Sequence, residues 1–262
     1  MVSKFTKRQT PLPSRLGALR LIHNGTIAKH SDAGLTLIES LIAIVVIAIT
    51  MVSITPPIFW AVASRVQVQR AEQALKLAQG EIDRVRVIIE RGETANLPPS
   101  VANLTEADVR NSTSGRFPAA PNTAGTGVIS TRACTNVGSI PSAIGTFAQL
   151  DTNGDCVGDY LLQTFRSQGF DQNGNRFEGT TGQVLTGFVM GVRVYSAIAR
   201  DELTAQRGET QPASLRGTNG LGNQRNRPLA VLYSTIVRSS ESQNLELYRK
   251  LCPAASQTTG AC

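Results

Sequence analysis

The first chemically distinctive residue is Glu39, a carboxylate at the start of a long apolar segment. From Ser40 to Ser64 the sequence contains no Asp, Glu, Lys, Arg or His. About 20 apolar residues are enough to span a bilayer as a helix. A charged group inside such a segment is costly and usually marks a function that involves a partner. The position of Glu39 therefore predicts contact with an oppositely charged group in the membrane.

The bond between Gly34 and Leu35 is a candidate cleavage site. A cut there would free an amine at Leu35, four residues and one helical turn from Glu39. The carboxylate and the amine would each need a partner in lipid, and subunits staggered along an axis could supply both. Two alternatives are weaker. An ordinary secretory signal would have a small-residue cleavage site after a shorter apolar stretch, and a plain single-pass anchor does not account for Glu39.

Most of the net charge of +7 lies in the first 34 residues. This tail holds six of the 26 basic residues and one of the 19 acidic residues, which leaves the remainder of the chain close to neutral. Basic residues beside a membrane segment hold their side in the cytoplasm. We therefore expect the inner, cytoplasmic membrane to be spanned once, with the C-terminal part exported to the periplasm or to a surface filament.

All four cysteines, Cys134, Cys156, Cys252 and Cys262, lie on the side that is expected to be exported, where disulfides form. Four cysteines allow three pairings. Proximity favours Cys134 with Cys156 and Cys252 with Cys262, and four free thiols are the alternative.

The segment from Gly34 onward resembles the N-terminal signature of type IV prepilins and type II secretion pseudopilins. The shared features are a basic leader that ends in Gly, an apolar residue, Glu four residues beyond it, and a long apolar helix. The resemblance implies that a prepilin peptidase cuts after Gly34 and methylates Leu35, and that Glu39 registers the subunit during assembly. It also implies other pilins or pseudopilins and an inner-membrane assembly platform as partners. Two departures are Leu35 in place of the commoner Phe and a long leader.

Pro56 and Pro57 interrupt the apolar run. Proline inside a helix removes a backbone donor and clashes with the preceding turn, so the pair predicts a kink or local unwinding. The alternative is that the helix ends there, at the membrane surface. Beyond the prolines, an apolar stripe predicts an amphipathic helix that ends at Gly92. The residues of this stripe are Val62, Val66, Leu75, Ile82, Val85 and Ile89.

The rest of the chain indicates an α+β fold. Alternating patterns predict strands at 187–197, 227–237, 160–165 and 127–133, while 93–126 and the polar segment 203–227 are expected to be loops. The resemblance implies a pilin-like layout, in which the long N-terminal helix packs on a small antiparallel sheet. We expect four parts: a leader (1–34), a transmembrane and assembly helix (35–60), an amphipathic helix (61–92) and an exported globular domain (93–262).

Oxygen donors at alternate positions in the sequence DTNGDCVGDY suggest a calcium site. The candidate ligands are Asp151, Asn153, Asp155, the Val157 carbonyl and Asp159, much as in an EF-hand loop. Cys156 stands where such a loop has Gly, and Leu162 where it has a bidentate Glu. The run Asp171, Asn173, Asn175 and Glu178 could complete the shell. Asn, Asp and Gly are also ordinary turn residues, so a plain turn is the alternative.

Histidine usage argues against an enzyme. The two histidines, His23 and His30, both fall in the leader, so the processed chain would have none for a triad, a proton shuttle or a zinc site. If the cysteines are paired, no thiol nucleophile remains either. We expect no catalysis and no cofactor other than the calcium considered above.

The pattern as a whole indicates a minor pilin or pseudopilin, a structural subunit of a pilus-like or secretion filament. Residues 61–86 resemble cyanobacterial pseudopilins of hormogonium polysaccharide secretion, which implies a role in polysaccharide secretion and gliding motility. One alternative is a membrane-anchored calcium- or glycan-binding surface protein. Another is a DNA-binding minor pilin with a basic stripe at Arg207, Arg216, Arg225 and Arg227. These arginines lack interleaved aromatics, so a solvated loop is the simpler interpretation and nucleic acid is not expected.

Overall fold

The structure is a computed structural model. It describes residues 36–94, 96–101, 104–110, 118–179, 182–214, 222–239 and 244–251, although the side chains of 56–60, 63, 107, 110, 222 and 244 are not described. Gly34, Leu35, Cys252, Cys262 and Arg216 lie outside these residues. The chain divides into two compact units, residues 1–52 and 53–262, each of which is described by itself.

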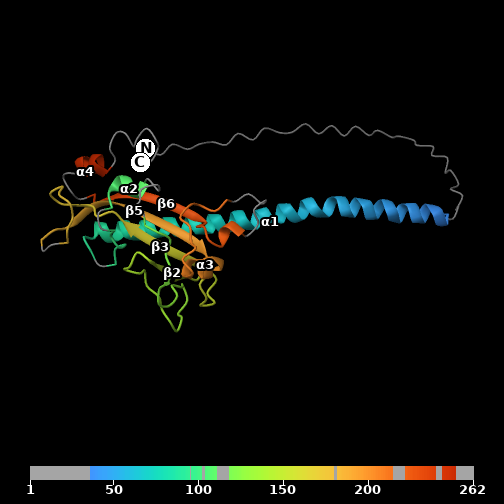
Figure 1. The fold of residues 1–262 in the computed structure, drawn as a ribbon, viewed down its shortest axis with the longest axis horizontal. Helices are drawn as coiled ribbons and strands as arrows, with labels where there is room; N and C mark the ends of the chain where they lie inside the picture. The colour runs from blue at the N-terminus through green and yellow to red at the C-terminus, as the bar shows by residue number, and fades with distance from the viewer. Residues whose placement is uncertain are drawn as a thin grey trace, which may run out of the picture. The chain divides into compact units, whose positions relative to one another are not determined.

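Helix α1 (Leu37–Glu90) begins at the apolar segment and continues through Pro56 and Pro57 (Figure 1). The interpretation of the prolines as a helix end is therefore wrong, and the backbone does not leave the helical conformation there. A proline removes only its own N–H donor, and apolar helices tolerate this because hydroxyls and adjacent turns satisfy nearby carbonyls. A bend at the prolines stays a prediction.

The two ends of α1 have the expected capping residues. The Thr36 hydroxyl accepts the Glu39 N–H at 3.3 Å, as a capping residue does at a helix start. At the other end, Gly92 has a φ of +74° and its N–H donates to the Ile89 carbonyl at 2.9 Å. Glycine adopts this left-handed conformation without a steric penalty, which is why the helix stops here.

The first unit contains most of the apolar part of α1. Among the helices of the described residues, Leu37–Thr55 is the one stretch long and apolar enough to cross a membrane, with a mean hydropathy of 2.6. None of it is buried inside the protein. An apolar surface of this extent requires lipid or a protein partner to cover it.

The second unit is built on a six-stranded sheet. Its central strand, β5 (Leu185–Ser196), pairs antiparallel with β3 (Tyr160–Arg166) on one side and β6 (Ala230–Val237) on the other. Beyond β3 lie β2 (Thr146–Leu150), antiparallel, and then β1 (Thr123–Ala124), parallel; β4 (Phe170–Asp171) pairs with β5. Three predicted strands are thus confirmed. The prediction at 127–133 is wrong, because Val128 and Ile129 form isolated bridges only, and β2 was missed.

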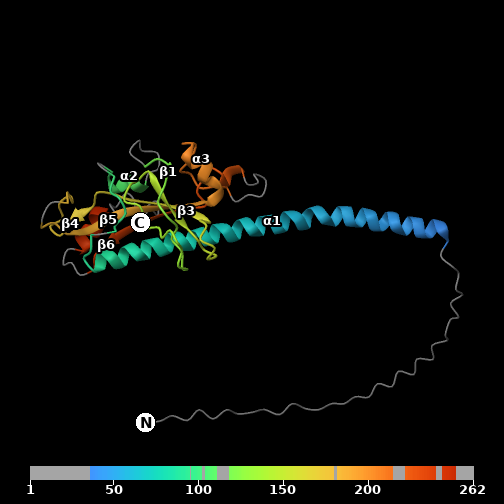
Figure 2. The ribbon, with the colours of Figure 1, turned by 90° about the horizontal axis from the view of Figure 1, so that it is seen from below.

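The C-terminal half of α1 covers one face of the sheet (Figure 2). The buried apolar residues of the helix are Ala74, Ala78, Ile82, Val85 and Ile89, and they pack with Phe188, Met190, Val192 and Val194 of β5. The predicted stripe is therefore right for its last three members. It is wrong for Val62, Val66 and Leu75, which are exposed. Ala74 and Ala78 make the contact with the sheet N-terminal to Ile82, and their small side chains let the helix approach the sheet closely.

Short helices cover the other face of the sheet. They are α2 (Glu106–Arg110), α3 (Arg200–Thr204), which continues a 3₁₀ turn (Ala197–Ala199), and α4 (Asn244–Leu251); a second 3₁₀ turn lies at Gly222–Gln224. Leu247 and Leu251 of α4 join Phe165 and Val189 in one apolar cluster. Both faces are covered, so β3 and β5 are buried along their whole lengths. The α+β, pilin-like layout is confirmed, with a second layer that the sequence did not reveal.

Two buried arginines on opposite faces hold the segment that follows α1. Arg166 Nε donates to the Pro98 carbonyl at 3.0 Å on the α1 face. Arg193 Nη1 donates to the Pro118 carbonyl at 2.8 Å and to Gln163 Oε1 at 2.9 Å on the other face. Burial removes water from both charges, which lowers the pKa of Arg193 and lowers that of Arg166 to about 10. The segment expected to be a loop is thus partly fixed to the sheet.

Candidate functional site

The first candidate site is the start of α1. The Glu39 side chain lies in the first turn, and the apolar residues around it, such as Ile38 and Ile42, are largely exposed. Within the described residues Glu39 forms no ion pair. A carboxylate on an apolar helix surface is stable in lipid only with a charged or hydrogen-bonding partner. In this chain the partner must come from outside the described residues.

The second candidate site is the loop after β2, which is centred on Asp151. This side chain is only 5% exposed, and its two oxygens accept four hydrogen bonds. Oδ1 accepts the N–H groups of Asn153 (3.0 Å) and Gly154 (2.7 Å), while Oδ2 accepts the Cys156 N–H and the Ser130 hydroxyl, both at 2.8 Å. Desolvation raises the pKa of Asp151, but the hydrogen bonds together outweigh it, so the pKa is below its ordinary value.

The Cys134–Cys156 disulfide ties this loop to the preceding segment, with the two Cα atoms 5.7 Å apart. This confirms one predicted pairing, whereas the pairing of Cys252 with Cys262 lies outside the described residues. Asp151 is the one acid that could join the two cysteines in a metal cluster among the described residues. Because the sulfurs are bonded to each other, they offer no thiolate for a metal.

The other predicted calcium ligands also close turns. Asp155 Oδ1 accepts the Val157 N–H at 2.8 Å, and Asp159 Oδ2 accepts the N–H and the hydroxyl of Thr152 at 2.9 and 2.7 Å. The run from Asp171 to Glu178 also forms a turn closed by its first aspartate, since Asp171 Oδ1 accepts the Asn173 and Asn175 N–H groups at 2.9 and 2.8 Å. In the described part of the chain, Asp151, Asp155 and Asp159 do not gather into one cluster. The geometry favours the turn interpretation, and calcium stays a prediction.

Removal of divalent metal provides a test of these turns. Because backbone N–H groups already occupy the oxygens of Asp151, we expect the melting temperature of the full chain to be the same in excess calcium and in EDTA. Differential scanning calorimetry in detergent measures this directly, and magnesium serves as the control ion. A rise of several degrees with calcium alone would instead establish the calcium site, since a ligand that binds only the folded state stabilises it.

Comparison with known families bears on the first site. Residues 29–55 match the family model described as the prokaryotic N-terminal methylation motif. The chain carries the N-terminal motif of type IV prepilins and pseudopilins. The match ends at Thr55, within the apolar part of α1, so it supports the pilin resemblance through the motif. No curated protein and no solved structure shows a significant match to the chain.

The motif has consequences for the role of the chain. It implies processing by a prepilin peptidase and assembly with other pilins. It indicates a structural subunit in place of an enzyme. Together with the apolar helix Leu37–Thr55, it fits a pilin that is anchored in a membrane by a single pass.

Two arginines of the basic stripe considered for DNA binding form ion pairs with nearby glutamates. Arg207 pairs with Glu202 and Arg227 with Glu209, each at 2.6 Å. A side-chain hydrogen bond from Arg207 is the largest cause of the lowered pKa of Glu202. Paired guanidinium groups are less available to phosphates, so these contacts favour the solvated-loop interpretation.

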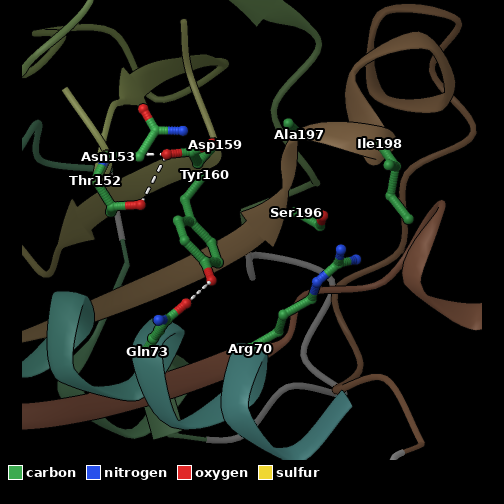
Figure 3. A pocket seen from close by; sticks show the side chains of 9 residues that line it. All are labelled: Arg70, Gln73, Thr152, Asn153, Asp159, Tyr160, Ser196, Ala197 and Ile198. Atoms are coloured by element: carbon green, nitrogen blue, oxygen red, sulfur yellow. Dashed lines mark hydrogen bonds between the residues drawn. The ribbon is translucent and has the colours of Figure 1, made fainter. Parts of the chain in front are cut away.

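A cavity between α1 and the sheet is the site that sequence reasoning missed. It measures about 290 Å³ (Figure 3). Its lining residues are Arg70, Gln73, Thr152, Asn153, Asp159, Tyr160, Ser196, Ala197 and Ile198. They come from α1, the loop after β2, the ends of β3 and β5 and the 3₁₀ turn Ala197–Ala199, so no single local spacing in the sequence could have grouped all of them. Two sequence signals pointed to parts of it: the calcium-like loop contains Asn153 and Asp159, and the amphipathic pattern of α1 places Arg70 and Gln73 three residues apart.

Proposed function

We propose that this chain is a minor pilin or pseudopilin, a structural subunit of a type IV pilus-like or type II secretion-like filament. The first half of α1 would insert in the inner membrane, and the part after it would be exported. A prepilin peptidase would cut after Gly34 and methylate Leu35, and an inner-membrane platform would add the subunit to the filament.

The observation that carries this proposal is the position of Glu39. It lies four residues beyond Leu35 in a matched methylation motif, on an exposed apolar helix, without an ion pair among the described residues. A neighbouring subunit that presents its Leu35 amine would neutralise it, and the apolar surfaces of the two helices would cover each other. A monomeric anchor would leave the same carboxylate in lipid without compensation.

We further propose that the filament serves polysaccharide secretion and gliding motility. The support is the resemblance of residues 61–86 to pseudopilins of that pathway. In the native host, deletion of this subunit should reduce gliding and exported polysaccharide together. Normal gliding and secretion in the deletion strain would remove this part of the proposal and leave the filament role standing.

The intact mass of the protein from its native membrane tests the filament role. We expect the mass of residues 35–262 plus one methyl group, because the peptidase both cuts and methylates. A Gly34→Leu variant should keep the full-length mass, since a bulky residue blocks the cut site. An uncut wild-type N-terminus would overturn the proposal.

A further inference from the structure

The cavity beside α1 contains polar groups that the protein leaves unused. The Arg70 guanidinium lies on the Ser196 side of the cavity (Figure 3). Among the described residues it makes no hydrogen bond or ion pair. A guanidinium can hold a carboxylate through two parallel hydrogen bonds. Arg70 is exposed, so its guanidinium is accessible to a ligand carboxylate at the cavity.

The neighbouring groups are suited to hydroxyls. Gln73 Oε1 accepts the Tyr160 hydroxyl at 2.7 Å, which orients the amide and leaves its NH₂ as a donor. Asp159 Oδ2 is occupied by Thr152, while its Oδ1 accepts nothing from the described residues. The Ser196 hydroxyl is likewise unused within the described part of the chain. A donor, an acceptor and a hydroxyl therefore line the same cavity as the cation.

We propose that this cavity binds a sugar unit that carries a carboxylate, of the uronic acid class. The carboxylate would lie on Arg70, and the ring hydroxyls would bond to Gln73, Asp159 and Ser196. The volume of about 290 Å³ lies near the lower end of the range of small-molecule sites, which suits one or two sugar rings. Ala197 and Ile198 provide an apolar wall for the C–H groups of the ring.

An acidic peptide fits this cavity less well. The only cation in the lining is Arg70, and Asp159 would repel a second carboxylate. A peptide side chain also supplies few hydroxyls for the three remaining groups. The sugar proposal does not rest on the filament role, because the cavity lies wholly within the second unit of the chain.

Titration of the full-length protein in detergent micelles tests the proposal. D-glucuronate should bind saturably with a Kd of about 1 mM, typical of a small ligand with few contacts. D-glucose, which has the same ring without the carboxylate, should bind at least tenfold more weakly. Saturation-transfer NMR and isothermal titration calorimetry measure both ligands at one salt concentration.

Arg70→Gln should weaken glucuronate binding at least tenfold, to the level of glucose. Arg65→Gln is the matched control, because Arg65 lies on the same helix, five residues earlier, and does not line the cavity. An unchanged melting temperature shows that Arg70→Gln remains folded. Three results would overturn the proposal: no saturable glucuronate binding, equal binding of glucose, or N-acetylglutamate binding as tightly as glucuronate. None of these depends on filament assembly, so failure here leaves the proposed function untouched.

Discussion

Replacing Glu39 by Leu is expected to abolish filament assembly while membrane insertion and N-terminal processing continue. The variant removes the carboxylate that we expect to pair with the Leu35 amine of the next subunit. That amine would then lie in lipid without a counter-charge, a cost of about 2.5–3.5 kcal/mol at a helix centre and less near its end. Since every subunit in a filament would repeat this cost, assembly should fall below detection. Electron microscopy and shearing of cell-surface filaments measure the loss.

Poor membrane insertion cannot explain a loss of filaments in this variant. Leucine is more favourable than glutamate in lipid, so Glu39→Leu cannot lose filaments through poor insertion. Glu39→Gln, which keeps hydrogen bonding and removes the charge, should also fail to assemble. Ser40→Ala is the matched control, because the one hydrogen bond that the Ser40 hydroxyl makes among the described residues is to the Leu37 carbonyl of its own helix, at 2.9 Å. Normal filaments with Glu39→Leu would show that Glu39 has no assembly role.

Much of the fold follows from strong patterns in the sequence. The run after Glu39 has no charge for 25 residues, so a single apolar helix was the only reasonable interpretation. Strands β5 and β6 were found because β-branched and aromatic residues cluster there between Gly- and Pro-rich segments. Gly92 ended the helix as predicted, because its left-handed backbone suits glycine.

The missed features have weak local signals. The contact of α1 with the sheet uses Ala74 and Ala78, and alanine is a poor marker of burial in an apolar-stripe search. The short helix α2 is only five residues long, and its Val109 is buried through contact with Phe165 and Val189 of the sheet. Arg166 and Arg193 seemed to be ordinary polar positions in their strands. Only the second layer over the sheet makes them buried residues.

The cavity could not be predicted for a related reason. Arg70, Tyr160 and Ser196 are far apart in the chain. They line one cavity only because α1 passes over the start of β3 and the end of β5. The Asp151 loop, by contrast, was recognised in the sequence, but its role could not be decided there. Its spacing fits either a calcium site or a turn, and the choice depends on whether backbone N–H groups reach the oxygens. In the folded loop they do, at 2.7–3.0 Å.

Replacing Arg193 by Ala is expected to give the largest loss of stability of any single substitution in the sheet. The side chain is fully buried, and its Nη1 bonds to the Pro118 and Ala119 carbonyls and to Gln163 Oε1. It also stacks over the Phe165 ring, 4.8 Å from the centroid. Alanine would leave a cavity and would remove the donor from two buried acceptors, the Pro118 carbonyl and Gln163 Oε1, which together cost about 3–5 kcal/mol.

Melting temperature and hydrogen exchange together distinguish release of the segment around Pro118 from unfolding of the whole domain. A loss of this size lowers the melting temperature by roughly 10 °C in a domain of this length. Because Arg193 fastens the segment around Pro118 to the sheet, hydrogen exchange should rise first at the Asn122 and Thr123 amides, which bond to the Gly145 carbonyl at 2.8 and 3.0 Å.

Arg132→Ala is the control for Arg193→Ala. The Arg132 side chain is exposed and makes one long hydrogen bond, at 3.3 Å, to the Gly154 carbonyl, so the change should cost less than about 0.5 kcal/mol. Arg193→Lys should fall between the two, because an ammonium keeps the charge but cannot reach all three acceptors in the geometry of the guanidinium. If Arg193→Ala leaves exchange at Asn122 and Thr123 unchanged, the arginine does not fasten this segment. The sheet must then hold the segment through its strand pairing alone.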